Sequence, residues 1–156
     1  MADYYTQFCF EIELPSDVIK WVIEEAQIYD NYDEIVDPDT EGGNYTPTGA
    51  EFTVEIERGV EVLVICASES GDPEVIVKIL QDALKKFELD IAIGFGWANT
   101  CSKMRVGDFG GGAVVFDKHS EKWIDTEFFI NDTKNAWNTD DGVVETTRDG
   151  IVKDPA

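Results

Sequence analysis

Basic residues are scarce in this sequence. Only 12 lysines and arginines stand against 33 aspartates and glutamates, so the 156 residues carry a formal net charge of −21. A surface of this sign repels the phosphates of nucleic acids and of anionic membranes, and it attracts basic protein surfaces. Direct binding to nucleic acid or to a membrane is therefore not expected, and the expected partner is a basic protein.

Long apolar runs are missing as well. No segment approaches the ~18 consecutive apolar residues of a membrane span. The first residues, MADYYTQF, place an acid where a signal peptide would have lysines, and no apolar region follows them. The sequence therefore predicts a cytoplasmic protein.

Histidine and cysteine, the residues of most nucleophilic and metal sites, are also few. His119 is the single histidine and lies in the polar segment DKHSEK, which leaves no partner for histidine-based catalysis. Three cysteines without CxxC spacing predict neither a disulfide framework nor a zinc site. Cys9 and Cys66 lie in apolar runs and are expected to be buried thiols, and Cys101 lacks the histidine that would activate it. No enzymatic activity, metal or cofactor is predicted.

The chain does contain enough apolar residues for a folded domain. It is 43% hydrophobic and 12% aromatic, unlike disordered chains of high charge. A chain of this length fits a single domain that buries roughly 70% of its unfolded surface. We expect one acidic α+β domain over residues 1–132 and a polar, loosely ordered C-terminal extension over residues 133–156.

Strand and helix patterns follow one another along the chain. Apolar residues alternate in TQFCFEIEL, which predicts a strand, and the segment after Ser16 has the period of a helix. EFTVEIE and VEVLVICAS, separated by Arg58 and Gly59, predict a hairpin. A second helix begins near Pro73, and IAIGFGW predicts the next strand. This β-α-β-β-α-β order predicts a ferredoxin-like core, extended by a strand at GGAVVFD and a strand or short helix at KWIDTEFFI.

The glycine-rich stretch GFGWANTCSKMRVGDFGGGAVVF poses the question of a phosphate site. A Walker loop requires Lys-Ser or Lys-Thr after its last glycine and then a helix, and a dinucleotide-binding loop also leads into a helix. Neither pattern is present, so the glycines are expected to shape the backbone. The alternative is a small-ligand or nucleotide-binding protein that uses the 97–112 loop and binds an anion through Ser102, Lys103, Arg105, Gly110 and Gly111.

A calcium loop is only partly matched. Asp37, Asp39, Glu41 and Gly42 fit positions 1, 3, 5 and 6 of such a loop, but Thr48 stands at position 12, where a bidentate glutamate is needed. We expect a solvated acidic loop here and no metal.

The negative charge is concentrated in the first part of the chain. Residues 1–62 hold sixteen acids and two bases, a net charge of −14. If this charge covers some ~40% of a surface of ~7,900 Å², it reaches about half the charge density of duplex DNA. The sequence therefore predicts a partner-binding face made of Glu24, Glu25, Asp30, Asp33, Glu34, Asp37, Asp39 and Glu41.

Three motifs, ESGDPE at a helix start, WANTCSKMR and FGGGAVVF, together resemble a group of uncharacterised small acidic proteins found in bacteria, phages and plasmids. The resemblance spans roughly residues 68–125 and implies a mobile-element context, without an activity or a catalytic residue to transfer. Combined with the charge, it leads to one hypothesis. The protein is a non-enzymatic, nucleic-acid-mimicking inhibitor of a basic nucleic-acid-binding host protein, such as a restriction or CRISPR component.

Overall fold

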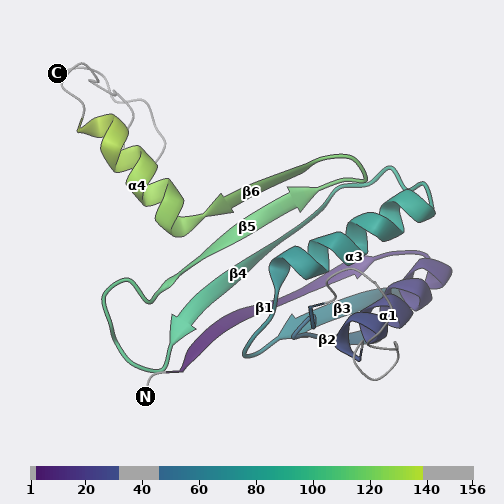
Figure 1. Cartoon of the computed structure of the whole chain (residues 1–156). Coiled ribbons are helices and arrows are strands. Elements are labelled where there is room, and N and C mark those ends of the chain that lie inside the picture. The colour runs from purple at the N-terminus through teal and green to yellow at the C-terminus, as the bar shows by residue number, and fades with distance from the viewer. Residues whose placement is uncertain (1–2, 32–45, 139–156) are drawn as a thin grey trace, which may run out of the picture.

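A computed structural model describes residues 3–31 and 46–138 of the chain (Figure 1). Its strands form one antiparallel sheet of six strands in the order β2-β3-β1-β4-β5-β6. In chain order the elements are β1 (Tyr4–Glu13), α1 (Ser16–Asp30), β2 (Glu51–Glu57), β3 (Val60–Ala67), α3 (Pro73–Lys86), β4 (Ile93–Cys101), β5 (Gly110–Phe116), β6 (Glu121–Asp125) and α4 (Thr126–Trp137).

Helices α1 and α3 lie on one face of the sheet and enclose the hydrophobic core (Figure 1). Val22 of α1 and Ile76 of α3 are fully buried in this core, together with Leu63 of β3. The start of α3 is fixed by Asp72, whose carboxylate accepts hydrogen bonds from the backbone N–H groups of the first turn, and by Pro73 at the first helical position. The predicted start of the second helix is therefore confirmed, whereas α1 begins at Ser16 itself and has no side-chain cap.

The prediction of a ferredoxin-like βαββαβ core is wrong. The first six elements follow one another in the expected chain order, but β5 and β6 join their strands in one six-stranded sheet of order β2-β3-β1-β4-β5-β6, which such a core does not have. The extra strands arise because GGGAVVF pairs with β4 along its whole length and EKWID then pairs with β5. The segment KWIDTEFFI, expected to be one strand or short helix, divides at Asp125 into the end of β6 and the start of α4.

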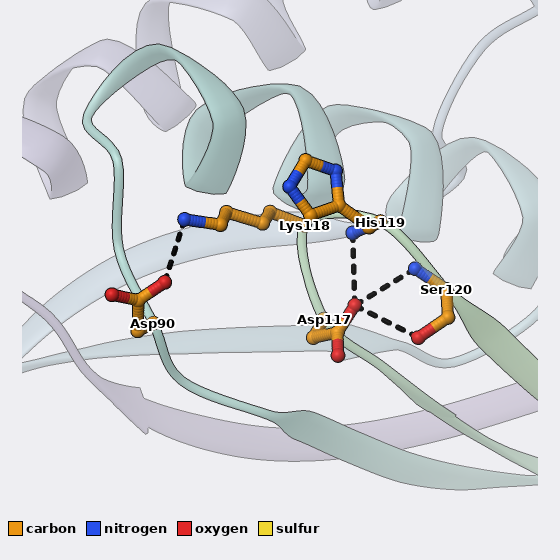
Figure 2. A network of polar contacts seen from close by, with 5 residues as sticks. All are labelled: Asp90, Asp117, Lys118, His119 and Ser120. Atoms are coloured by element: carbon orange, nitrogen blue, oxygen red, sulfur yellow. Dashed lines mark hydrogen bonds and ion pairs between the residues drawn. The ribbon is translucent and has the colours of Figure 1, made fainter.

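The turn between β5 and β6 is stabilised by one aspartate (Figure 2). The Asp117 carboxylate accepts hydrogen bonds from the backbone N–H groups of His119 and Ser120 and from the Ser120 hydroxyl, at 2.8 to 2.9 Å. These bonds stabilise the charged form and lower the pKa of Asp117. Lys118 forms an ion pair of 2.6 Å with Asp90 before β4, which lowers the pKa of Asp90. His119, the only histidine, thus belongs to a structural turn.

The prediction that Cys9 and Cys66 are buried free thiols is wrong. They face each other directly across β1 and β3 and form a disulfide bond. Cys9 is exposed and Cys66 half-buried, because both point to the face of the sheet opposite the helices. The residues next to each cysteine in the sequence are apolar because their side chains point to the other side of the strand, toward the core. Cys101 is a free, buried thiol.

The C-terminal part of the described chain forms a helix. Residues 133–137 complete α4, whereas residues 139–156 lie outside the described residues. The boundary between a domain of residues 1–132 and an extension of residues 133–156 therefore stays a prediction. Within the described ranges, no helix combines the length and the apolar character needed to cross a membrane.

Candidate functional site

Five glutamates share the face of the sheet that lies opposite α1 and α3. The register pairs Glu11 with Val64 and Thr53, and Glu13 with Val62 and Glu55, so these side chains emerge on one face. Phe8, Leu63 and their neighbours point to the other face, into the core. We call this set the glutamate face; it consists of Glu11, Glu13, Glu51, Glu55 and Glu57.

The glutamate face is arranged as two rows on either side of β3. Glu11 and Glu13 lie on β1, and the other three lie on β2, at the edge of the sheet. Between the rows lie valines of β3; one of them, Val62, is only 6% exposed although it lies outside the main core.

The charge density of this face is high. Three strands of about seven residues cover roughly 14 by 24 Å, which gives one carboxylate per ~70 Å². Duplex DNA carries one phosphate per ~110 Å² by a similar estimate. The strands β1, β2 and β3 contain no lysine or arginine, so within these strands no base neutralises the carboxylates. The local density therefore exceeds the half-DNA value expected from the sequence.

The carboxylates are close enough to affect one another. The negative charge of Glu11, and a hydrogen bond between the two side chains, raise the pKa of Glu57. A smaller contribution of the same sign comes from Glu55 on the same strand. Two like charges held together in this way favour protonation of one of them, and a cation placed between them would relieve the repulsion.

The partner-binding face predicted from the sequence lies elsewhere. Glu24 is exposed and Glu25 half-buried on α1, which covers the opposite side of the sheet. Asp30 accepts hydrogen bonds from the backbone N–H and the hydroxyl of the buried Thr48, at 2.7 and 2.9 Å. The predicted face is thus described only in part, because the following members lie outside the described residues: Asp33, Glu34, Asp37, Asp39 and Glu41.

Sequence reasoning missed the glutamate face, although a signal for it exists. The strings FEIE and EFTVEIE place glutamates at every second position of strands, which puts them on the side away from the core. The missing information was that β1 and β2 flank the same strand, because only tertiary pairing brings residues 11–13 and 51–57 together.

The anion-binding alternative gains no support from the positions of its residues. The Ser102 hydroxyl already has a partner within the chain, since it accepts a hydrogen bond from the backbone N–H of Asp3, just before β1, at 2.9 Å. The side chains of Lys103 and Arg105 are exposed. A cavity of about 280 Å³ does lie beside Gly110 and Gly111, but its charged lining consists of Asp108, Asp125 and Glu127, without either base. The anion site therefore stays a prediction.

The glycine triplet has a packing role. A side chain at Gly112 would overlap the indole of Trp97, which lies over this position of β5. Trp97 then reaches Trp123 of β6, with ring centroids 5.7 Å apart and an edge-on geometry. The expectation that glycines in this stretch shape the structure is confirmed at this position.

A larger groove of about 920 Å³ runs between α3 and strands β4 to β6, on the helix side of the sheet. Trp97 and Trp123 form part of its wall, and its acids include Asp72 and Asp125. Both of these aspartates already cap helices, since they accept hydrogen bonds from backbone N–H groups of α3 and α4. These two aspartates thus have structural roles, and the groove itself lies where the two helices leave part of the sheet uncovered.

In the described part of the chain, no group of three or more histidine, cysteine, aspartate or glutamate side chains is placed to hold a metal ion. Comparison with protein-family models, with curated proteins and with solved structures finds no match. The resemblance to small acidic proteins of mobile elements therefore stays a prediction.

Proposed function

We propose that this protein is a non-enzymatic binding protein whose partner is a basic, nucleic-acid-binding protein, and that the glutamate face is its binding surface. The observation that carries the proposal is the glutamate face itself: five carboxylates on β1 and β2, which flank β3, with no base in any of these three strands. The net charge of −21 adds a long-range attraction toward the same basic partner.

The rigidity of the surface also supports the proposal. The carboxylates are placed by the hydrogen-bonded strands β1, β2 and β3. A partner therefore meets charges that are already positioned, so less conformational entropy is lost on binding. The two rows of carboxylates would act on a basic groove as the phosphates of a nucleic acid do.

The binding is expected to be fast and sensitive to salt. Attraction between oppositely charged surfaces raises association rates, and added salt screens it. We propose the cytoplasm as the place of action. Thiol reductants in that compartment would keep Cys9 and Cys66 reduced, so binding is to be measured in both the oxidised and the reduced protein.

The proposal is tested with a deca-arginine peptide as the basic probe, titrated calorimetrically at several salt concentrations. Three charge-matched variants are compared, each with five acids changed to the amides. One changes the glutamate face, and one changes the loop acids Asp33, Glu34, Asp37, Asp39 and Glu41. The control changes exposed acids elsewhere, namely Asp17, Glu69, Glu88, Glu127 and Asp132.

We expect the glutamate-face variant to lose at least tenfold in affinity and most of the salt dependence, while the control variant loses much less. Equal losses in the three variants would show that only the net charge matters. A loss confined to the loop variant would move the binding surface to the face predicted from the sequence.

A further inference from the structure

Helix α4 exposes its apolar side chains to solvent. None of its residues is buried, and Phe128, Phe129 and Ile130 are 74%, 56% and 48% exposed. In Figure 1 the helix leaves the end of β6 and projects away from the sheet. An isolated helix of about twelve residues is marginal in water, so α4 needs a packing partner to be stable.

The same chain contains an apolar surface without large side chains. On the face opposite the helices, the register pairs Gly94 with Val115 and Gly96 with Ala113, and Ala98 lies next along β4. We call Gly94, Gly96, Ala98 and Ala113 the glycine floor. Its β4 members are exposed, and Val115 and Ile124 border it with 56% and 52% of their surfaces exposed.

Charge separates this end of the molecule from the glutamate face. Residues 1–92 hold twenty-two acids and five bases, a net charge of −17, whereas residues 93–138 hold six acids and five bases, a net charge of −1. Strands β4 and β5 contain no charged residue at all. The floor and α4 thus belong to the part of this acidic protein with the smallest net charge, where two copies approach each other with the least repulsion.

We propose that two copies of the chain associate by laying α4 of each copy on the glycine floor of the other. Phe128 and Phe129 would supply the rings, and the floor, which lacks side chains beyond Cβ, would supply the space for them. This inference is independent of the proposed function, because it uses β4, β5 and α4 and no carboxylate of the glutamate face.

The geometry favours a second copy over α4 of the same chain. Helix α4 begins at the residue after the end of β6, and the Asp125 carboxylate caps it by accepting a hydrogen bond from the Phe128 N–H at 2.8 Å. This capped junction directs α4 away from its own sheet, so folding back onto its own floor would require breaking it. The chain thus carries both halves of a self-complementary contact, as an isologous dimer requires.

The available area suits such a dimer. The exposed parts of the three large side chains of α4 amount to roughly 350 Å², judged from the size of buried aromatic residues. Each copy would contribute this area and a floor of similar size, about 700 Å² in total. A stable protein–protein interface buries about 800 Å² per partner, so the contact is of the required order.

Analytical ultracentrifugation of the full chain over a range of concentrations and salt tests the proposal. We expect a reversible dimer of twice the 17.4 kDa chain mass that persists in high salt, because its contacts are apolar. The double substitution Phe128→Glu and Phe129→Glu should weaken dimerisation at least ~100-fold. Ala98→Glu on the floor should weaken it similarly.

The matched control is Lys134→Glu, which changes the net charge by the same two units on the side of α4 away from Phe128 and Phe129 and should leave the dimer intact. Circular dichroism confirms that each variant is folded, and the two disruptive variants lie on different elements. A monomer at all concentrations overturns the proposal. So does a dimer that survives both the α4 and the floor substitutions. Deca-arginine binding by the monomeric variants reports on the glutamate face separately.

Discussion

Glu11 and Glu57 lie on β1 and β2, with β3 between them, and the negative charge of Glu11 raises the pKa of Glu57. Neither residue has the other as its pairing partner in the sheet, so the interaction is made by the long side chains over the valines of β3. This relationship shows that the glutamate face is electrostatically crowded in the absence of a partner. A cationic partner would therefore be attracted by these carboxylates, and its charge would offset the repulsion between Glu11 and Glu57.

Glu57→Gln should stabilise the protein at neutral pH. The folded-state pKa of Glu57 lies above its ordinary value of 4.5, so the folded chain binds this proton more tightly than the unfolded chain does. The free energy of unfolding of the wild type consequently falls as pH rises through the raised pKa, and the substitution removes this loss. Thermal unfolding at pH 4 and pH 7 measures it. The gain should appear at pH 7 and shrink at pH 4, and an equal gain in Glu69→Gln would contradict it.

Loss of the Cys9–Cys66 disulfide should destabilise the fold without changing it. The bond closes a loop with a sequence separation of 57, for which the chain-entropy relation gives a contribution of about 4 kcal/mol. Urea unfolding of the wild type, with and without reductant, measures the difference. The variant Cys9→Ser with Cys66→Ser should be insensitive to reductant. Alkylation of both cysteines in the unreduced, unfolded protein would show that the bond is absent.

Gly112→Ala should lower stability by about 1–3 kcal/mol through overpacking. The added methyl group would overlap the Trp97 indole and the Ile124 carbonyl oxygen, and neither group has room to move without disturbing β6. Gly110→Ala is the matched control, since its methyl group would meet Thr126 at an ordinary contact distance of 3.8 Å. Urea unfolding of both variants, with tryptophan fluorescence as the readout, tests this; equal stability of the two would refute the packing role.

Thr48→Val should lower the free energy of unfolding by about 1–2 kcal/mol, because the Asp30 carboxylate loses the hydrogen bond that the Thr48 hydroxyl donates. Thr48 is fully buried and its hydroxyl donates to the Asp30 carboxylate at 2.9 Å. Thr53→Val, at an exposed position of β2, is the control and should change stability by less than ~0.5 kcal/mol. If the two variants unfold alike, Asp30 is free to serve mainly as a partner-binding residue.

Local structure was predictable from the sequence, and long-range pairing was not. Alternation located β1 and β2, Pro73 located the start of α3, and Arg58 with Gly59 formed the expected hairpin turn, both with positive φ. A strand at GGAVVFD was expected, but a sixth strand at EKWID was left open, because the local pattern of KWIDTEFFI fits a strand and a short helix alike. The disulfide was missed because the pairing of Cys9 with Cys66 depends on the register of β1 against β3.

The candidate site shows the same limit. The excess of acids in residues 1–62 is visible in the sequence and predicts a basic partner, but the sequence cannot tell which acids share a face. Glu11 and Glu57 are separated by most of that segment and meet only because β3 inserts between their strands. The predicted face was built from neighbours along the chain, and it stays a prediction because five of its eight members lie outside the described residues.

The most direct test of the proposed function is a paired affinity capture from a nuclease-treated bacterial lysate. The wild type and the variant with all five glutamates of the glutamate face changed to glutamine are immobilised side by side. We predict that the wild type retains basic nucleic-acid-binding proteins, that added duplex DNA displaces them, and that the variant retains none of them. Retention of the same proteins by both forms, or retention that DNA does not reverse, would contradict the glutamate face as a mimic of nucleic acid.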